Sequence, residues 1–302
     1  MRGLLLAALL AVPASAGLWT TDLKAALTAA GEKGTLVFVD LFGPSCAACR
    51  VMEDTVLSTP EMERLRGRLE LVKLDTATPE GERFKKEHRI LGVPTYIVLD
   101  PRGEEVGLLL GERRPAVFFA QLEEILAKRT SLKEAELRAA QGGPCTLPEA
   151  RAVISAHAQR RTAKEGLAFF AKLPDALRRQ AEEDPAAGSD LQRLRLYLAR
   201  DAQRGAACAA PARRLLELNQ GFLDAYDLFL IRACSSYQPE QERRKAFEVL
   251  RAPLEKLLAE QLPRPRSKRT TDFGILTSEA EWFYESNGPK EKLEKLRKNL
   301  GR

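Results

Sequence analysis

The amino-acid sequence predicts an α/β domain followed by an all-helical domain. From Gly17 to Thr130, short apolar segments typical of buried strands alternate with segments of helical periodicity. Beyond Thr130 the strand-like segments stop and helical patterns alone continue. A length of 302 residues suits two domains better than one, and a hydrophobic content of 44% can supply a core for each.

The first domain, residues 17–130, is predicted to alternate helices with strands. The strands are short, rich in valine, isoleucine and leucine, and bounded by turn residues such as Pro101-Arg102-Gly103. Apolar residues at helical spacing mark the segments between them. We expect helices at 22–30, 46–57, 60–67, 79–88 and 115–128, and strands at 36–41, 69–74, 96–99 and 105–110.

The second domain, residues 148–302, is predicted to be helical throughout. A linker at 131–147 separates it from the first, because Gln141-Gly142-Gly143-Pro144 breaks regular structure and suggests a hinge. Stacked helix pairs of this size resemble tetratricopeptide-like solenoids, although the period is irregular and that family's signature residues are not evident. Helices are expected at 148–173, 175–183, 189–204, 211–218, 223–235, 240–261, 273–285 and 289–300.

The N-terminal segment, residues 1–16, has the pattern of a cleaved secretory signal. Arg2 gives a positive start, residues 4–12 form a short apolar run, and Ala14-Ser15-Ala16 is a small-residue cleavage site. The apolar run is too short to span a bilayer, and the alternative is a buried N-terminal helix. We therefore expect a soluble mature chain that begins near Gly17 and is exported to a bacterial periplasm.

The charge distribution argues against nucleic acid as a partner. The net charge is +6, and the basic excess lies in residues 131–302, where it is mixed with acidic residues as on a solvated helical surface. The densest basic stretch, residues 263–269, has no interleaved aromatic residues. An acidic protein or a membrane surface suits such a stretch better.

Cys46 and Cys49 carry the main functional signal. They lie at a junction between a strand-like and a helix-like segment, one helical turn apart. Helix N-terminal amide groups stabilise a thiolate, so Cys46 is expected to attack disulfides and Cys49, one turn deeper, to resolve the mixed disulfide. An inert disulfide is one alternative. Half a zinc site is another, but His88 and His157 have no suitable spacing, so we expect no metal and no other cofactor.

The residues around this pair resemble the thioredoxin superfamily. Asp40 lies six residues before Cys46, and Val93-Pro94-Thr95 and Gly111 lie at the family's expected distances downstream. The runs 39–49, 75–78 and 91–95 are most similar to the C-terminal periplasmic domain of the thiol:disulfide interchange protein DsbD. The chain departs from thioredoxins at Ser45, where they carry tryptophan, and in the Ala47-Ala48 pair.

The resemblance implies roles for the neighbours of the cysteine pair. Asp40 would be a buried carboxylate with a raised pKa that exchanges a proton with Cys49. Pro94 would be a cis-proline, and Val93 would offer backbone groups to an extended client segment. Ser45 and Thr95 are expected to border the same client site.

These expectations describe an exported thiol:disulfide oxidoreductase. Because Ala47-Ala48 adds no charge that would lower the thiol pKa further, we expect a reducing couple. By resemblance, a membrane protein of the DsbD or CcdA kind would supply the electrons, protein disulfides would be the clients, and the helical domain would bind a protein partner. The alternatives are a non-catalytic thioredoxin-fold scaffold and a disulfide isomerase.

The remaining cysteines suggest a second disulfide. Cys208 and Cys234 lie on either side of Gly221, at equal distances from it in the sequence. If Gly221 is the turn of a helix hairpin, the two sulfurs lie at matching heights, and a structural disulfide is expected. The alternative is a pair of buried thiols. Cys145, in the predicted linker, would then be the odd thiol in an oxidising compartment.

Overall fold

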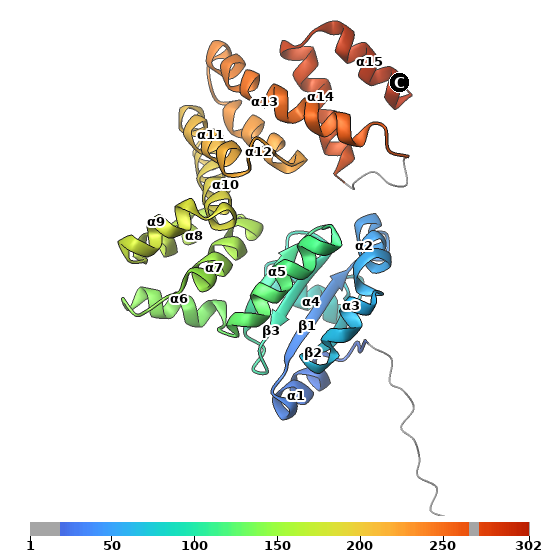
Figure 1. The fold of residues 1–302 in the computed structure, drawn as a ribbon, viewed down its shortest axis with the longest axis vertical. Coiled ribbons are helices and arrows are strands. Elements are labelled where there is room, and N and C mark those ends of the chain that lie inside the picture. Colours follow the sequence, from blue (N-terminus) through green and yellow to red (C-terminus); the bar gives the residue numbers. More distant parts are fainter. Residues whose placement is uncertain (1–18, 266–271, 302) are drawn as a thin grey trace, which may run out of the picture.

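The computed structural model describes residues 19–265 and 272–301 (Figure 1). We call α1 to α5 and their strands the sheet domain, and α6 to α15 the helical region. The strands agree with the sequence prediction to within one residue at each end. The sheet domain comprises α1 (Leu23–Lys33), β1 (Leu36–Phe42), α2 (Ala47–Met52), a π-helical turn η1 (Glu53–Leu57), α3 (Pro60–Glu63), a 3-10 turn η2 (Arg64–Gly67), β2 (Leu69–Asp75), α4 (Pro79–Glu87), β3 (Thr95–Leu99), β4 (Glu105–Leu110) and α5 (Pro115–Lys128).

Local capping interactions explain where several helices begin and end. The Asp22 carboxylate accepts the Ala25 N–H at 2.9 Å at the start of α1, and the Thr78 hydroxyl accepts the Gly81 N–H at 3.1 Å at the start of α4. Pro79 occupies the first turn of α4, where its missing N–H costs nothing. Gly34 ends α1 with φ of 67°, which glycine adopts without strain.

The four strands form one mixed sheet in the order β2-β1-β3-β4. β1 pairs with β2 in parallel, whereas β3 pairs antiparallel with both β1 and β4. One end of the sheet therefore holds the C-terminal ends of β1 and β2, the start of β3 and the end of β4. This end carries the N-terminus of α2, and we call it the redox end.

Alternating side chains give the sheet two buried faces. Phe38 and Tyr96 project to one face, where Met52 of α2, Met62 of α3 and Phe118 of α5 cover them. Tyr96 stacks on Phe38 at 5.7 Å between ring centroids and meets Phe118 edge-on at 5.0 Å. The opposite face packs against α1, α4 and the first helices of the helical region.

The helical region continues the sheet core directly, which corrects the linker expected at 131–147. Helix α6 (Leu132–Ala140) occupies most of that range, and Leu132, Ala135 and Ala139 join the same core as Val39 and Ile97. The expectation of a linker is wrong. The sequence indicates one because α6 is short and the glycine-rich segment after it has the composition of a hinge. Residues 141–146, which begin with a turn, form a short connection to the next helix, α7 (Leu147–Arg160).

Every element in the described residues of the helical region is a helix, as the sequence predicts. The two largest differences concern the first helices. The helix expected at 148–173 is divided at Arg161, whose φ is 56°, and the helix expected from 189 begins earlier because Asp184 caps it. The elements after α6 are α7 (Leu147–Arg160), α8 (Ala163–Lys172), α9 (Asp175–Glu183), α10 (Pro185–Asp201), a 3-10 turn η3 (Gly205–Cys208), α11 (Ala209–Leu218), α12 (Ala225–Ser235), α13 (Glu240–Gln261), α14 (Phe273–Asn287) and α15 (Lys290–Leu300).

A separate hydrophobic core holds the last helices together. It combines the end of α10 with α11 to α15, and Cys208 and Cys234 lie within it, fully buried. Their sulfurs are 1.91 Å apart and their Cα atoms 5.9 Å apart, so the structure joins η3 to α12 by a disulfide. Gly221 turns the chain between α11 and α12 with φ of 78°.

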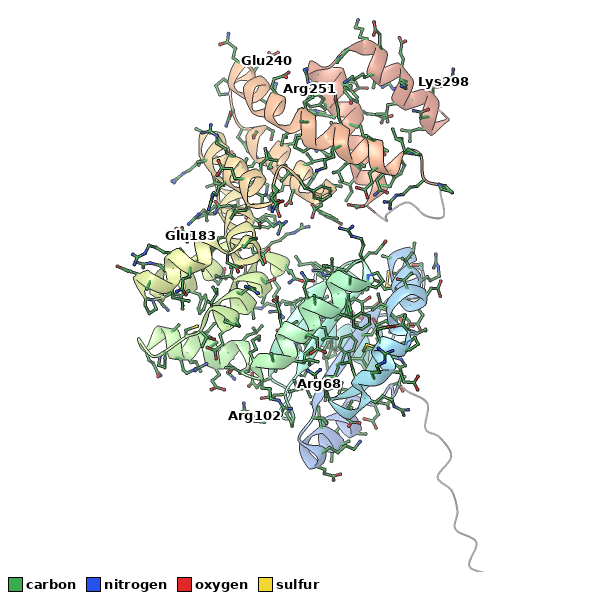
Figure 2. All side chains as sticks on the ribbon, in the orientation of Figure 1. Arg68, Arg102, Glu183, Glu240, Arg251 and Lys298 are labelled. Atoms are coloured by element: carbon green, nitrogen blue, oxygen red, sulfur yellow. A yellow bond between two sulfur atoms is a disulfide. The ribbon has the colours of Figure 1, made fainter. Side chains whose placement is uncertain are left out.

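Charged residues cover the outside of the molecule, and Arg102, Glu183 and Lys298 point into solvent (Figure 2). Within the residues that the structure describes, no helix combines the length and apolarity that crossing a membrane requires. The predicted signal segment, residues 1–16, lies outside the described residues.

Candidate redox site

Cys46 and Cys49 form a disulfide at the redox end. Their sulfurs are 2.16 Å apart and their Cα atoms 5.2 Å apart. Cys46 is the residue immediately before α2, and its Sγ accepts the backbone N–H of Cys49 at 3.0 Å. Cys46 is half-buried, whereas Cys49 is only 9% exposed. A more accessible sulfur at a helix N-terminus, with a buried sulfur one turn behind it, is an arrangement that suits disulfide exchange.

The loop before β3 lies against this disulfide. The Val93–Pro94 peptide bond is cis. A Cβ atom placed on Gly43 would lie 3.4 Å from Val93 Cγ2 and 3.9 Å from Cys46 Cβ, so the loop and the cysteine meet around Gly43. The Gly111 N–H donates to the Pro94 carbonyl oxygen at 2.8 Å and ties the loop to the end of β4.

The three residues expected at the client site differ in exposure. Ser45 is exposed beside Cys46, and Val93 is half-exposed. Thr95 is fully buried, and its hydroxyl donates to the Gly92 carbonyl oxygen at 2.6 Å. The Thr95 side chain therefore cannot touch a client, and it braces the cis-proline loop instead.

Asp40 lies on β1, two residues before the end of the strand, with only 3% of its surface exposed. Burial raises the pKa of its carboxyl group to about 7, and the nearby Glu53 charge adds to the rise while the Lys73 charge opposes it. Lys73 lies directly across from Asp40 on β2 but forms an ion pair with Glu53 at 2.5 Å. A carboxyl group with this pKa can take up or release a proton near neutral pH.

Two further residues, which were not expected from the sequence, belong to this environment. Tyr96 lies across from Asp40 on β3, and its hydroxyl is buried without a hydrogen-bond partner among the described residues. Arg113, in the loop after β4, donates its backbone N–H to Met52 Sδ at 3.2 Å and its Nε–H to Gln121. The alternation of β2 and β3 could have placed Lys73 and Tyr96 beside Asp40, but nothing local marks Arg113.

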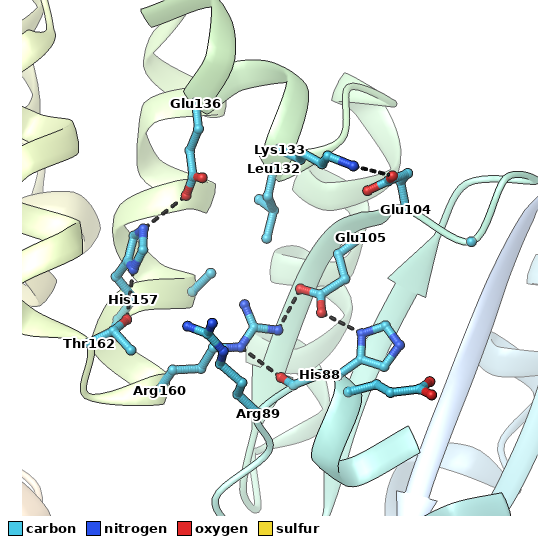
Figure 3. A pocket seen from close by; sticks show the side chains of 13 residues that line it. His88, Arg89, Glu104, Glu105, Leu132, Lys133, Glu136, His157, Arg160 and Thr162 are labelled. Carbon is cyan, nitrogen blue, oxygen red and sulfur yellow. Dashed lines mark hydrogen bonds and ion pairs between the residues drawn. The ribbon is translucent and has the colours of Figure 1, made fainter. Parts of the chain in front are cut away.

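A polar pocket of about 330 Å³ lies at the opposite end of the sheet, between the sheet domain and the helical region (Figure 3). Both histidines of the chain line it. His88 Nδ1 and Glu105 Oε1 are 2.5 Å apart, and Arg160 from α7 binds Glu105 Oε2 at 2.5 Å and the His88 carbonyl oxygen at 2.9 Å. His157 bonds Glu136 at 2.9 Å. These groups bind one another and join α7 to the sheet.

The neighbouring residue, Gln159, extends this junction along β4. Its side-chain oxygen accepts the Leu110 N–H at 2.6 Å, and its amide group donates to the Leu108 carbonyl oxygen at 3.2 Å. β4 is an edge strand, so Gln159 satisfies backbone groups that a fifth strand would otherwise pair. We call Gln159, Arg160, His88 and Glu105 the α7 dock.

Cys145 is the unpaired cysteine. It lies half-buried in the turn between α6 and α7, where its thiol donates to the Thr146 carbonyl oxygen at 3.6 Å. Burial raises the pKa of its thiol, and the charge of Glu149 raises it further. Such a thiol forms little thiolate and is a poor nucleophile.

The fold and the site define the first part of the chain as a thioredoxin-like domain. Residues 18–101 match a family model described as thioredoxin-like. The mixed sheet, the cysteine pair before α2 and the cis-proline loop agree with that match.

This domain resembles the C-terminal domain of the thiol:disulfide interchange protein DsbD. The chain is 36% identical to DsbD of Cronobacter sakazakii over 87 residues, 28% of this chain and 15% of that protein. It is 29% identical to DsbD of Pseudoalteromonas atlantica over 109 residues, 35% of this chain and 18% of that protein. The chain thus spans less than a fifth of the length of these relatives.

Solved structures overlap the same part of the chain. A thioredoxin from Thermus thermophilus is 33% identical with a TM-score of 0.34, covering 36% of this chain and 87% of its own. The oxidised C-terminal domain of DsbD from Neisseria meningitidis is 27% identical with a TM-score of 0.31, covering 35% and 97%. Because each covers about a third of this chain, the fold assignment rests on the sheet order and the family model.

Proposed function

We propose that this chain is an exported thiol:disulfide oxidoreductase that reduces protein disulfides. The observation that carries the proposal is the Cys46–Cys49 disulfide itself, which lies at the N-terminus of α2. Cis-Pro94 and the buried Asp40 lie toward the same end of the sheet. The similarity to proteins named DsbD supports the same chemistry.

The reduced site supplies two electrons to a client in two steps. The Cys46 thiolate attacks one sulfur of the client disulfide, a mixed disulfide forms, and the other client sulfur leaves as a thiolate that takes up a proton. Cys49 then transfers its proton to Asp40 and attacks Cys46 Sγ. The second client sulfur leaves and is protonated, so the client gains two thiols while the Cys46–Cys49 disulfide forms.

The two residues between the cysteines favour the reducing direction. The Cys49 N–H contacts Cys46 Sγ at 3.0 Å at the start of α2, where amide groups stabilise a thiolate. Ala47 and Ala48 add no charge that would stabilise the thiolate further. A less stabilised thiolate makes the reduced form a better electron donor, and we place the couple near that of thioredoxin, at about −270 mV.

Partners and location follow from the same proposal. The signal-like segment at residues 1–16 supports export to the periplasm. There a membrane protein of the DsbD or CcdA kind would reduce the Cys46–Cys49 disulfide after each turnover. The helical region would bind a protein partner. Its helices would form a tetratricopeptide-like array, which is supported by helices that pack in series, such as α7 with α8 and α10 with α11.

Catalytic reduction of insulin by the mature chain, with dithiothreitol as electron source, tests the function. Wild-type protein is expected to accelerate the reaction, and Cys46→Ser to abolish the acceleration. Cys49→Ser is expected to accumulate a mixed disulfide with insulin, because resolution is blocked. A wild-type chain that binds insulin without turnover would instead support the scaffold alternative, and one that reshuffles scrambled disulfides faster than it reduces them would support an isomerase.

A further inference from the structure

The helical region reaches toward the redox end of the sheet domain. The α7 dock fixes α7 to β4, α10 packs on α7, and α12 packs on α10. The charges of Asp190 on α10 and Asp224, which caps α12, act on Arg113 in the loop after β4. That loop begins at Gly111, which is bonded to cis-Pro94. The start of α12 therefore faces the same end of the sheet domain as the redox disulfide, and Figure 1 shows α12 on the side of the molecule beyond the upper ends of α2 and α5.

The exposed side of α12 and the loop before it are aromatic. Phe222, Tyr226 and Phe229 are 36%, 53% and 36% exposed. Tyr226 and Phe229 lie three residues apart and so share one face of α12. Lys256 lies over the Phe222 ring at 5.5 Å, and Arg232 lies over the Phe229 ring at 5.4 Å. Three exposed aromatic side chains in one short segment indicate a contact surface rather than incidental exposure.

The redox end carries exposed apolar side chains of its own. Leu91 is 52% exposed two residues before Val93, and Val117 is 40% exposed in the first turn of α5. Val93 belongs to the loop that borders the disulfide, and Arg113 lies two residues before α5, so both apolar side chains belong to segments at the redox end. An extended polypeptide advances about 3.4 Å per residue, so a client segment that starts at the disulfide can continue past this loop.

We propose that Phe222, Tyr226 and Phe229 form a second client contact, which binds an extended apolar segment of the polypeptide whose disulfide is reduced at Cys46. The inference rests on the proposed function and names its substrate class: unfolded rather than folded proteins. A folded client hides its apolar residues, whereas an unfolded one offers apolar side chains at many positions along the chain. Rings flanked by Lys256 and Arg232 accept such segments without demanding one sequence.

The test separates binding from redox chemistry. The probe is carboxymethylated, permanently unfolded lactalbumin with a fluorescent label, which has neither thiols nor disulfides. Its Kd for the full mature chain is measured by fluorescence anisotropy. The double variant Tyr226→Ser/Phe229→Ser is expected to raise the Kd about tenfold, since aromatic side chains dominate such contacts. The matched control is Tyr237→Ser, because Tyr237 is 48% exposed but lies beyond the end of α12.

Steady-state reduction of two substrates completes the test. The double variant is expected to raise the KM for scrambled ribonuclease A, an unfolded protein that carries disulfides, by a similar factor. It should leave reduction of the small disulfide 5,5′-dithiobis(2-nitrobenzoic acid) unchanged. An unchanged Kd in the double variant, or an equal rise in Tyr237→Ser, would overturn the inference. If the double variant does not fold, Phe222→Ser, which lies outside the helix, decides by the same criterion. A wild-type chain that binds the probe but reduces neither disulfide would overturn the proposed function and not the contact surface.

Discussion

Lys73 lies directly opposite Asp40 in the sheet, yet its ammonium group forms an ion pair with Glu53 at 2.5 Å. Glu53 belongs to the π-helical turn that follows α2, so the helix that contains Cys49 and begins after Cys46 is tied to β2 by this pair. Burial is the dominant influence on the Asp40 carboxyl group and raises its pKa to about 7, although the Lys73 charge acts to lower it. This arrangement gives a buried carboxyl group that changes its protonation in the range where thiols exchange.

The pKa of Asp40 predicts a specific pH dependence of stability. The pKa is higher in the folded chain than in the unfolded one, so ionised Asp40 opposes folding above about pH 7. The free-energy cost of burying Asp40 becomes smaller as the pH falls from about 7 toward 3.8, the pKa of its carboxyl group in the unfolded chain. Asp40→Asn should therefore stabilise the oxidised protein by about 2–4 kcal/mol at pH 8 and by almost nothing near pH 4.

Urea unfolding of the sheet domain measures this effect. Trp19 packs edge-on against Phe38 at 6.0 Å and reports on that core, so the measurement uses a Trp282→Phe background that removes the other tryptophan. Asp54→Asn, at an exposed carboxylate of the same π-helical turn, is the control and should not alter the pH dependence. Equal stability of wild type and Asp40→Asn at pH 8 would show that burial does not raise the pKa of Asp40.

Asp40→Asn should also slow the second step of exchange. Without a carboxylate to accept its proton, Cys49 attacks the mixed disulfide at least about tenfold more slowly at pH 8. Rapid-quench trapping of the reduced enzyme with a disulfide peptide should show accumulation of the mixed disulfide. Alkylation of Cys46 by iodoacetamide is the control, because the first thiolate should react at its wild-type rate. Mixed-disulfide decay as fast as in wild type would remove Asp40 from the mechanism.

The α7 dock should contribute strongly to stability. Burial acts to raise the pKa of Glu105, but its hydrogen bond with His88 and the charge of Arg160 outweigh this effect and hold the pKa below its ordinary value. Arg160→Met leaves this buried carboxylate with His88 alone and should cost about 2–4 kcal/mol. Lys164→Met, an exposed change nearby on α8, should cost little.

A double variant distinguishes the ion pair from lost packing. Glu105→Leu combined with Arg160→Met removes both charges, so it should be less destabilised in urea than the sum of the single variants. Strictly additive losses would mean that Arg160 acts through its apolar stem and not through Glu105.

The Cys208–Cys234 disulfide should stabilise the last helices. It closes a loop with a sequence separation of 26, which corresponds to about 3 kcal/mol of restricted unfolded-state entropy. Cys208→Ala/Cys234→Ala should therefore melt earlier by Trp282 fluorescence, while Cys145→Ala should melt like wild type. The same melting temperature with and without the disulfide would contradict the entropic account.

Sequence alone can place the centre of the site because its signals are local. Cys46 and Cys49 share one turn of helix, and Val93-Pro94 has its own loop signature. The strands are predictable because each is a short apolar run that β-branched residues and leucine dominate. The burial of Thr95 is not predictable in this way, because its exposure depends on the strand pairing around it.

The junction between the two parts of the chain leaves no comparable signal. Gln159 bonds to β4 across 49 residues of sequence, and Arg160 bonds to Glu105 across 55. Neither contact produces a periodic pattern, since a single polar side chain that meets a strand edge resembles any solvated residue. The sequence of helix α6 resembles a linker because the helix is short, has three buried residues and is followed by two glycines.

The reduction potential of the Cys46–Cys49 couple tests the central claim most directly. The mature Cys145→Ala chain is equilibrated with glutathione or dithiothreitol redox buffers, and the fraction of reduced Cys46 is determined by alkylation. We predict a reversible two-electron couple at or below about −230 mV, with insulin reduced by catalytic amounts of protein. A potential between about −180 and −120 mV, or no reversible couple, would contradict the assignment of this protein as a disulfide reductase.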